Sequence, residues 1–251
     1  MSFANKVVIV TGASSGIGAA AAAAFSGEGA QVVMVGRNVE KLSAVAKRCN
    51  KPLVIKADVT NEQDAVRIID ETIQKFGKLD VLVNNAGSGS MDGSLFNKNT
   101  LKCLDAMINL NLRSVVHLVS LAAPHLVKTK GNIVNVSSVA GQIPPLGPGS
   151  THYGVSKAGL NHFTFCAAAE LGALGVRINT VSPGPVRTDF LTNSNYPPLS
   201  WDDCAKFTVL DRAPEPQEVA NVILFLAGDK AASITGSNYV ADNGMMAKRS
   251  K

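Results

Sequence analysis

A tyrosine and a lysine four positions apart, Tyr153 and Lys157, are the side chains in this sequence best suited to acid–base chemistry. Residues 152–171 have a helical pattern, and on a helix positions i and i+4 share one face. A phenol keeps its proton up to about pH 10, but a nearby ammonium stabilises the phenolate and lowers that pKa. The pair predicts a tyrosine that exchanges a proton with substrate near neutrality. On this motif alone, an ordinary pair on a helix surface is the alternative.

Hydroxyl groups lie close by in the sequence. Ser137 and Ser138 follow a predicted strand at residues 132–136 and precede the helix that carries the pair. A hydroxyl there can hold a carbonyl oxygen while the tyrosine protonates it, and capping of the strand end is the alternative. The histidines form no competing pattern, and we expect His152 to be a wall residue of the site; the others are His117, His125 and His162.

A glycine-rich turn, TGASSGIG at residues 11–18, lies between a short apolar run and an alanine-rich helical run. Strand, glycine turn and helix together make a phosphate cradle, because the backbone can approach a diphosphate and the new helix presents unpaired N–H groups. Ser14 and Ser15 add hydroxyls at the helix entry. The spacing is G-x-x-x-G-x-G, so the common dinucleotide fingerprint is met only approximately. A simple turn before a core helix is the alternative.

The end of the second predicted strand indicates which dinucleotide is bound. An acidic residue there would bind the adenosine ribose of NAD, but the sequence reads Gly36-Arg37-Asn38. A guanidinium can hold a 2′-phosphate with two parallel hydrogen bonds. This favours NADP(H), with NAD(H) as the alternative. Asp58 and Val59 end the third strand, where they either face an adenine edge or begin the next helix.

The elements that must position these residues alternate along the chain. Apolar runs predict strands at residues 6–10, 31–35, 53–56, 79–83, 132–136, 176–181 and 238–240. Helical patterns occur at residues 17–25, 39–49, 62–76, 100–128, 152–171 and 215–227, while residues 183–211 look irregular. This alternation predicts an α/β fold with one doubly wound parallel sheet and a single domain over residues 1–251. In such a sheet the ligand lies at the carboxyl ends of the strands.

Composition narrows the function classes. The chain has 251 residues, 46% of them hydrophobic, which suffices for a large core. Its net charge of +5 owes much to the basic tail at residues 246–251, so a nucleic-acid role has little support. The N-terminus runs directly into the first strand, and no apolar run of about 18 residues occurs, so we expect neither signal peptide nor membrane span. The cysteines predict reduced thiols in the cytoplasm and no zinc site; they are Cys49, Cys103, Cys166 and Cys204.

Five motifs now stand in order at the predicted strand ends: TGASSGIG, NNAG, a serine after the fifth strand, YGVSK and PGPVRT. In this combination the chain resembles the short-chain dehydrogenase/reductase superfamily, in its soluble branch of about this length. The resemblance covers residues 5–244. It implies a Rossmann-type sheet of seven strands in three layers, α/β/α, a catalytic Asn–Ser–Tyr–Lys tetrad, and a homotetramer built through residues 100–128 and 152–171.

The resemblance also implies roles for individual residues. Tyr153 would be the general acid/base, and Lys157 would lower its pKa and bind the nicotinamide ribose. Ser138 matches the substrate-orienting serine of the family better than Ser137 does. Asn111 matches the asparagine that anchors a proton-relay water, with Asn109 as the competing choice.

The cofactor contacts implied by the resemblance extend along the strand ends. They run from the diphosphate and adenosine to the nicotinamide carboxamide. The residues are Gly12, Ser14, Ser15, Gly16, Ile17, Gly18, Arg37, Asn38, Asp58, Val59, Asn85, Ala86, Gly87, Tyr153, Lys157, Pro183, Gly184, Val186 and Thr188.

The sequence departs from the family pattern in three places. The segment between Ser138 and Tyr153 is slightly longer than usual, with three prolines in residues 142–150, which predicts a reshaped pocket rim. Ser15 stands where some NADP-dependent members carry a basic residue, so only Arg37 supports NADP. The usual Asp-Gly-Gly before the C-terminus reads Asp-Asn-Gly at residues 242–244, which we interpret as a turn variant.

The expected reaction is reversible hydride transfer between NADP(H) and a ketone or secondary alcohol. The substrate is expected to be hydrophobic, such as a steroid or ecdysteroid, a prenol or retinoid, or a 3-oxoacyl thioester. This rests on three segments from which we expect specificity, residues 88–97, 142–150 and 190–211. Their apolar residues include Met91, Leu95, Phe96, Ile143, Leu146, Phe190, Leu191, Tyr196, Leu199 and Trp201. Rival interpretations are a non-catalytic dinucleotide sensor, a sugar epimerase, whose relatives are usually longer, and an enoyl reductase, whose relatives space tyrosine and lysine more widely.

Overall fold

A parallel sheet forms the centre of the molecule. The computed structural model describes residues 2–89, 94–144, 149–194 and 200–248. In this part of the chain the sheet has seven strands in the order β3-β2-β1-β4-β5-β6-β7, every neighbouring pair parallel. The strands are β1 (Val7–Thr11), β2 (Gln31–Gly36), β3 (Leu53–Lys56), β4 (Val81–Asn84), β5 (Asn132–Val136), β6 (Arg177–Pro183) and β7 (Asn238–Ala241). The chain reverses its winding direction between β1 and β4, which is where doubly wound folds bind their ligands.

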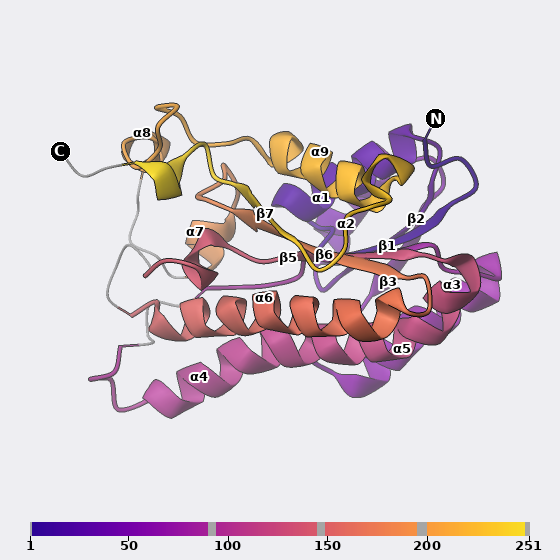
Figure 1. Ribbon diagram of the computed structural model, residues 1–251, viewed down its shortest axis with the longest axis horizontal. Helices are drawn as coiled ribbons and strands as arrows, with labels where there is room; N and C mark the ends of the chain where they lie inside the picture. The colour runs from indigo at the N-terminus through magenta and orange to yellow at the C-terminus, as the bar shows by residue number, and fades with distance from the viewer. Residues whose placement is uncertain (1, 90–93, 145–148, 195–199, 249–251) are drawn as a thin grey trace.

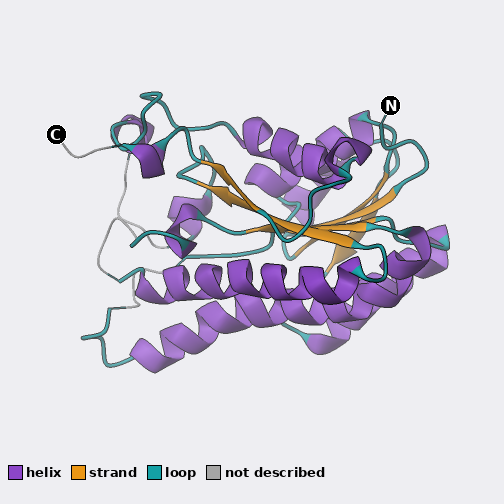
Figure 2. Ribbon diagram, in the orientation of Figure 1, coloured by secondary structure: helices purple, strands orange, loops and turns teal. Residues whose placement is uncertain are grey.

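Helices cover both faces of this sheet (Figures 1 and 2). One face packs against α1 (Gly16–Gly27), α2 (Val39–Ala46) and α9 (Pro216–Ala227). The other packs against α3 (Glu62–Phe76), α5 (Ser114–Thr129) and α6 (Thr151–Gly172), with α4 (Thr100–Ile108) beside α6. The prediction of a three-layer Rossmann-type fold is therefore confirmed.

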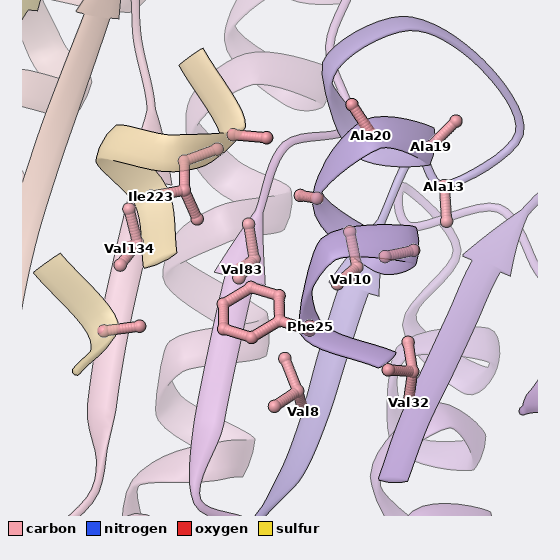
Figure 3. Close-up of a cluster of buried hydrophobic side chains, with 14 of the residues drawn as sticks. Val8, Val10, Ala13, Ala19, Ala20, Phe25, Val32, Val83, Val134 and Ile223 are labelled. Carbon is pink, nitrogen blue, oxygen red and sulfur yellow. The ribbon is translucent and has the colours of Figure 1, made fainter. Parts of the chain in front are cut away.

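The strand β1 shows how the sequence builds two cores. Successive side chains of a strand point to opposite faces, so Val8 and Val10 enter one core while Val7 and Ile9 enter the other. In Figure 3 the Phe25 ring of α1 lies over the sheet among valines of neighbouring strands. The alanines before Phe25 have small side chains, which lets α1 lie close to the sheet beside the glycine-rich turn at residues 11–18.

Most predicted boundaries agree with the structure to within a few residues, and β3, α3 and β5 agree fully. The segment 183–211 is an exception, because it contains two short helices, α7 (Phe190–Asn193) and α8 (Trp201–Ala205), where we expected irregular chain. Four or five residues are too few to give a helical period. The second exception is a π-helical turn, Asn109–Arg113, between α4 and α5.

The helical segment Thr100–Thr129 is long and apolar enough to cross a membrane by length and composition alone. Several of its side chains, including Val115, Leu118 and Leu126, are buried in the core between α5 and the sheet. Core helices of soluble proteins pass the same test, so this finding is weak evidence for a membrane span.

Candidate active site

A cavity of about 830 Å³ lies across the carboxyl ends of the strands, a size typical of ligand pockets. Its wall includes the glycine-rich turn at residues 11–18, the ends of β2, β5 and β6, and the first turns of α6. Of the residues predicted to bind the cofactor or act on substrate, all but Gly18 and Asn111 line it. Those lining it are Gly12, Ser14, Ser15, Gly16, Ile17, Arg37, Asn38, Asp58, Val59, Asn85, Ala86, Gly87, Ser138, Tyr153, Lys157, Pro183, Gly184, Val186 and Thr188.

The glycine-rich turn has the backbone shape that its glycines permit. Gly12 and Gly16 adopt backbone φ values of +66° and +54°, which residues other than glycine rarely adopt. Ser15 is the N-cap residue of α1, yet its side chain makes no capping bond. The start of α1 therefore presents N–H groups and a hydroxyl to the cavity, which is the donor set that a diphosphate needs.

Two residues predicted to contact the cofactor, Asn85 and Gly18, also shape this turn. The Asn85 side chain donates to the carbonyl oxygens of Thr11 and Gly12, at 2.9 and 3.3 Å, and so holds the turn against β4. Gly18, the second of these residues, does not line the cavity. A Cβ atom at Gly18 would lie 2.3 Å from the Gly12 oxygen, so the position needs glycine for close packing of helix and turn.

Arg37 lies at the end of the cavity where we predicted the adenosine. The Arg37 side chain is 76% exposed, and a guanidinium nitrogen lies 3.8 Å from Asp58 Oδ2. The other carboxylate oxygen of Asp58 accepts hydrogen bonds from the backbone N–H and hydroxyl of Thr60, at 3.0 and 2.7 Å. Asp58 thus organises the turn before α3 while it also lines the cavity.

The neighbouring Asn38 caps α2, because its side-chain oxygen accepts a hydrogen bond of 2.9 Å from the Lys41 backbone N–H. The Lys41 side chain also lines the cavity, and sequence reasoning missed it. Its Nζ lies 2.9 Å from Asp189 Oδ2, a residue far away in the sequence. The sequence did offer one indication of this role: Lys41 lies in the first turn of the helix that follows Arg37.

Tyr153 and Lys157 lie on the first turns of α6 and are 8% and 4% exposed. The Lys157 Nζ lies 5.8 Å from the centroid of the Tyr153 ring and donates a hydrogen bond of 2.9 Å to the Val136 carbonyl oxygen. Burial lowers the pKa of Lys157 to about 8. Its ammonium is therefore mostly protonated at pH 7, which is the state that stabilises a phenolate.

The two serines after β5 have different surroundings. The Ser137 hydroxyl is buried and donates to the Lys157 carbonyl oxygen at 3.2 Å, which ties the strand end to α6. The Ser138 oxygen accepts a hydrogen bond of 3.1 Å from the Ala140 N–H, and an accepting hydroxyl keeps a proton that it can donate. This geometry is compatible with Ser138 as the serine that meets a substrate oxygen.

Asn111 lies behind the cavity wall, in the π-helical turn, and is fully buried. Its side-chain oxygen accepts a hydrogen bond of 3.1 Å from the Ser88 backbone N–H. Its amide nitrogen donates to the Ser88 backbone carbonyl oxygen at 2.9 Å and to the Ser156 hydroxyl at 3.1 Å. The Ser156 hydroxyl donates in turn to the Tyr153 carbonyl oxygen at 2.7 Å. The π-turn and the helix that carries Tyr153 are therefore joined through one buried amide. Asn109, the competing choice, is half-buried.

The other end of the cavity is apolar. Ile143, Phe190, Leu191 and Trp201 line it as predicted, and the Phe190 ring lies 5.7 Å from the Tyr153 ring. Pro144, Cys204 and Phe207 also line this end, and they lie within the segments 142–150 and 190–211 from which we expected specificity. Sequence reasoning missed Leu110 and Met245, which lie outside those segments.

Some expected pocket residues do not contribute. Leu95 and Phe96 are 69% and 100% exposed and do not line the cavity, because the loop before α4 turns them to solvent. His152 is buried outside the wall, with Nε2 2.7 Å from the Thr100 hydroxyl, so it joins α6 to α4. Met91, Leu146, Tyr196 and Leu199, like the end of the basic tail, lie outside the described residues.

Known proteins share both sequence and geometry with this chain. Residues 12–246 match a family model described as enoyl-(acyl carrier protein) reductase. A solved short-chain dehydrogenase/reductase from Caenorhabditis elegans, described as having its cofactor, superposes with a TM-score of 0.92 at 35% identity, over 99% of this chain and 98% of that one. The chain belongs to the short-chain dehydrogenase/reductase superfamily. The resemblance seen in the motifs is confirmed.

Among relatives of this superfamily member, two show the range of substrates. A meso-2,3-butanediol dehydrogenase from Serratia marcescens is 38% identical over 251 residues, covering 98% of this chain and 97% of the relative. A 3-oxoacyl-[acyl-carrier-protein] reductase from Thermotoga maritima is 36% identical over 249 residues, covering 96% and 98%. Both names describe oxidoreduction between a hydroxyl and a carbonyl group. The chain is accordingly an NAD(P)-dependent oxidoreductase of the dehydrogenase/reductase type.

Proposed function

We propose that this protein is an NADP(H)-dependent oxidoreductase that interconverts a hydrophobic ketone and its secondary alcohol. The observation that carries the proposal is the buried Lys157 ammonium beside Tyr153, in a cavity whose far end exposes Arg37. The first pair supports proton transfer, and Arg37 supports a dinucleotide with a 2′-phosphate.

The cavity residues fit a dinucleotide from end to end. Gly12 and Gly16 leave the turn without side chains where a diphosphate would approach, and the α1 N–H groups and Ser15 would bind its oxygens. Pro183, Gly184, Val186 and Thr188 would seat the nicotinamide at the end of β6. A bound nicotinamide supplies or accepts the hydride.

The proton chemistry belongs to the residues of α6 and its neighbours. Tyr153 protonates the carbonyl oxygen during reduction and takes the proton back during oxidation. The Lys157 ammonium favours the phenolate, which brings the phenol pKa toward neutrality. Ser138 donates a hydrogen bond to the same substrate oxygen. Asn111 keeps the π-turn in register with α6, and with Lys157 it passes the proton toward solvent.

The preference for NADP(H) rests on charge at the end of β2. Arg37 offers two parallel donors to a 2′-phosphate, and Gly36 stands where a carboxylate would repel that phosphate. Asp58, 3.8 Å from Arg37, is the residue that weakens this preference, since it attracts the same guanidinium. An NAD(H)-dependent alcohol dehydrogenase of the same fold is the alternative.

A hydrophobic substrate is favoured by the apolar end of the cavity, where Ile143, Phe190 and Trp201 face the space beside Tyr153. Steroid or ecdysteroid ketones, prenols or retinoids, and 3-oxoacyl thioesters share this apolar character. The 3-oxoacyl-[acyl-carrier-protein] reductase among the relatives supports the thioester.

Enoyl reduction is a second candidate, favoured by the description of the matching family model. The four-residue spacing of Tyr153 and Lys157 speaks against it, because enoyl reductases that resemble this family space the pair more widely.

The protein's state in the cell forms part of the proposal. Apolar side chains stand exposed on the outer faces of α5 and α6, with Val116 at 39%, Val155 at 51% and Phe165 at 66%, which supports a homotetramer built through these helices. A reducing cytoplasm is also part of the proposal, and its support is the sequence, in which the four cysteines are far apart and form no C-x-x-C pair.

The test is oxidation of NADPH, followed by its fluorescence, across a panel of steroid ketones, retinal, 3-oxoacyl thioesters and an enoyl thioester. Each substrate is repeated with NADH. Turnover of steroid ketones, retinal or 3-oxoacyl thioesters with a preference for NADPH supports the proposal. Turnover of the enoyl thioester alone, or a clear preference for NADH, refutes the corresponding part of it.

A further inference from the structure

We propose that Lys41 is a second binding residue for the 2′-phosphate of NADP(H), and that Asp189 occupies its ammonium until the cofactor arrives. This inference rests on the proposed NADP(H) dependence and adds a specificity-determining residue to it. It starts from a lysine that the motifs did not single out and that the proposed chemistry leaves unused.

The position of Lys41 follows from the cap of α2. Its backbone N–H donates to Asn38 Oδ1 at 2.9 Å, so Lys41 sits in the first helical turn, directly after the strand end that bears Arg37. Both side chains line the same cavity. Only three residues separate Lys41 from Arg37, so we infer that the long Lys41 side chain can also reach a phosphate bound by Arg37.

The partner of Lys41 comes from the opposite rim. Lys41 Nζ lies 2.9 Å from Asp189 Oδ2, and the two side chains are 49% and 54% exposed. Asp189 follows Thr188, which lines the cavity, and precedes α7. An ion pair so open to water is weak, because solvent screens the attraction and both side chains lose freedom in forming it.

A phosphate is the stronger competitor for this ammonium. A phosphate monoester carries a charge near −2 at neutral pH and offers three strong acceptor oxygens, whereas Asp189 carries −1. Arg37 can balance only one of those charges, and its guanidinium already lies 3.8 Å from Asp58. Lys41 supplies the missing positive charge. NAD(H) has a neutral hydroxyl in place of this phosphate, so Lys41 should stay paired with Asp189 when NAD(H) binds.

Substitutions of Lys41 and Asp189 should change the affinity for NADPH in opposite directions. Removing the charge of Lys41 weakens binding of NADPH, whereas removing the charge of Asp189 releases Lys41 and strengthens it. Binding of NADH stays nearly unchanged in both cases. A merely structural ion pair predicts instead that both substitutions act in the same direction and on both cofactors.

The experiment is a fluorescence titration of NADPH and NADH binding to the purified protein, at constant pH and low salt. It compares the unaltered chain with Lys41→Gln, Asp189→Asn and the matched control Lys47→Gln. Lys47 is an exposed lysine at the other end of α2, outside the cavity wall, and its substitution changes the net charge equally. Thermal unfolding of each variant checks that the fold is retained.

For Lys41→Gln we expect the affinity for NADPH to fall about tenfold, the effect of one charge-assisted contact, and that for NADH to change less than about twofold. For Asp189→Asn we expect the affinity for NADPH to rise about two- to threefold, and for Lys47→Gln no selective change. If the unaltered protein prefers NADPH but Lys41→Gln retains full affinity, or loses NADH equally, the inference is overturned and the proposed function stands. If the unaltered protein binds both cofactors equally, the NADP(H) preference itself is refuted, and this role of Lys41 with it.

Discussion

Replacing Lys157 by methionine should make the protein more stable at pH 7 and inactive at the same time. The lysine is 4% exposed, and burial lowers its pKa to about 8. In an unfolded chain the pKa of lysine is about 10.4, and each pKa unit corresponds to about 1.4 kcal/mol. The buried ammonium therefore costs the folded state about 3 kcal/mol at pH 7. Methionine has a similar length and carries no charge.

The loss of a hydrogen bond to Val136 opposes this gain in stability. The Val136 carbonyl oxygen accepts a hydrogen bond from Lys157, and leaving a buried carbonyl without a donor costs about 1 to 2 kcal/mol. We therefore expect Lys157→Met to raise the free energy of unfolding by about 1 to 2 kcal/mol in the absence of cofactor. Turnover should vanish, because the phenolate of Tyr153 loses its counter-charge.

The stability difference between Lys157→Met and the unaltered protein should depend on pH in a defined direction. Below pH 8 the lysine is protonated in both folded and unfolded chains, so the full cost is present. Between pH 8 and about 10.4 the folded protein has lost this proton and the unfolded chain still binds it, so the stability of the unaltered protein rises relative to the variant. The advantage of Lys157→Met should shrink over this range.

Urea unfolding at several pH values and one fixed protein concentration measures this difference, with Tyr153→Phe as the control that keeps the lysine. A variant less stable than the unaltered protein at pH 7, or a difference that does not depend on pH between 8 and 10, would refute the reasoning about the buried charge.

Three further substitutions test the site. Gly18→Ala places a Cβ atom 2.3 Å from the Gly12 oxygen, so NADPH affinity measured by titration should fall at least about tenfold; unchanged affinity would show that the turn tolerates the movement. Asn111→Ala removes the amide that joins the π-turn to Ser156, and kcat should fall about 10- to 100-fold while NADPH binding persists, unless the helix holds its register without that amide. Arg37→Gln should lower the ratio of NADPH to NADH affinity about 10- to 100-fold, and an unchanged ratio would remove Arg37 from cofactor selection.

The sheet and its order of elements were predictable because parallel strands buried on both faces leave continuous β-branched runs. The side chains of β1 alternate between the two cores, and the alanines of α1 predict a helix packed closely on the sheet. The same alternation places strand ends at one edge, which is why nearly every predicted site residue lines one cavity.

What the sequence concealed depends on local geometry. The π-turn adds a residue within a continuous helical pattern, and no periodicity reveals that Asn111 points inward while Asn109 lies half-buried. Adjacent serines look alike until Ser137 is seen bonded to the Lys157 carbonyl. The partner of Lys41, Asp189, is distant in sequence, so the pair becomes visible only when the rims of the cavity are brought together.

The most direct test of the proposed chemistry is the turnover of Tyr153→Phe with NADPH and the best ketone of the panel, measured beside NADPH binding by the same protein. The substitution removes one hydroxyl and keeps the ring that lies 5.7 Å from the Phe190 ring. Loss of nearly all turnover with unchanged NADPH affinity is the predicted result. Full turnover in this variant would contradict the assignment of Tyr153 as the acid/base.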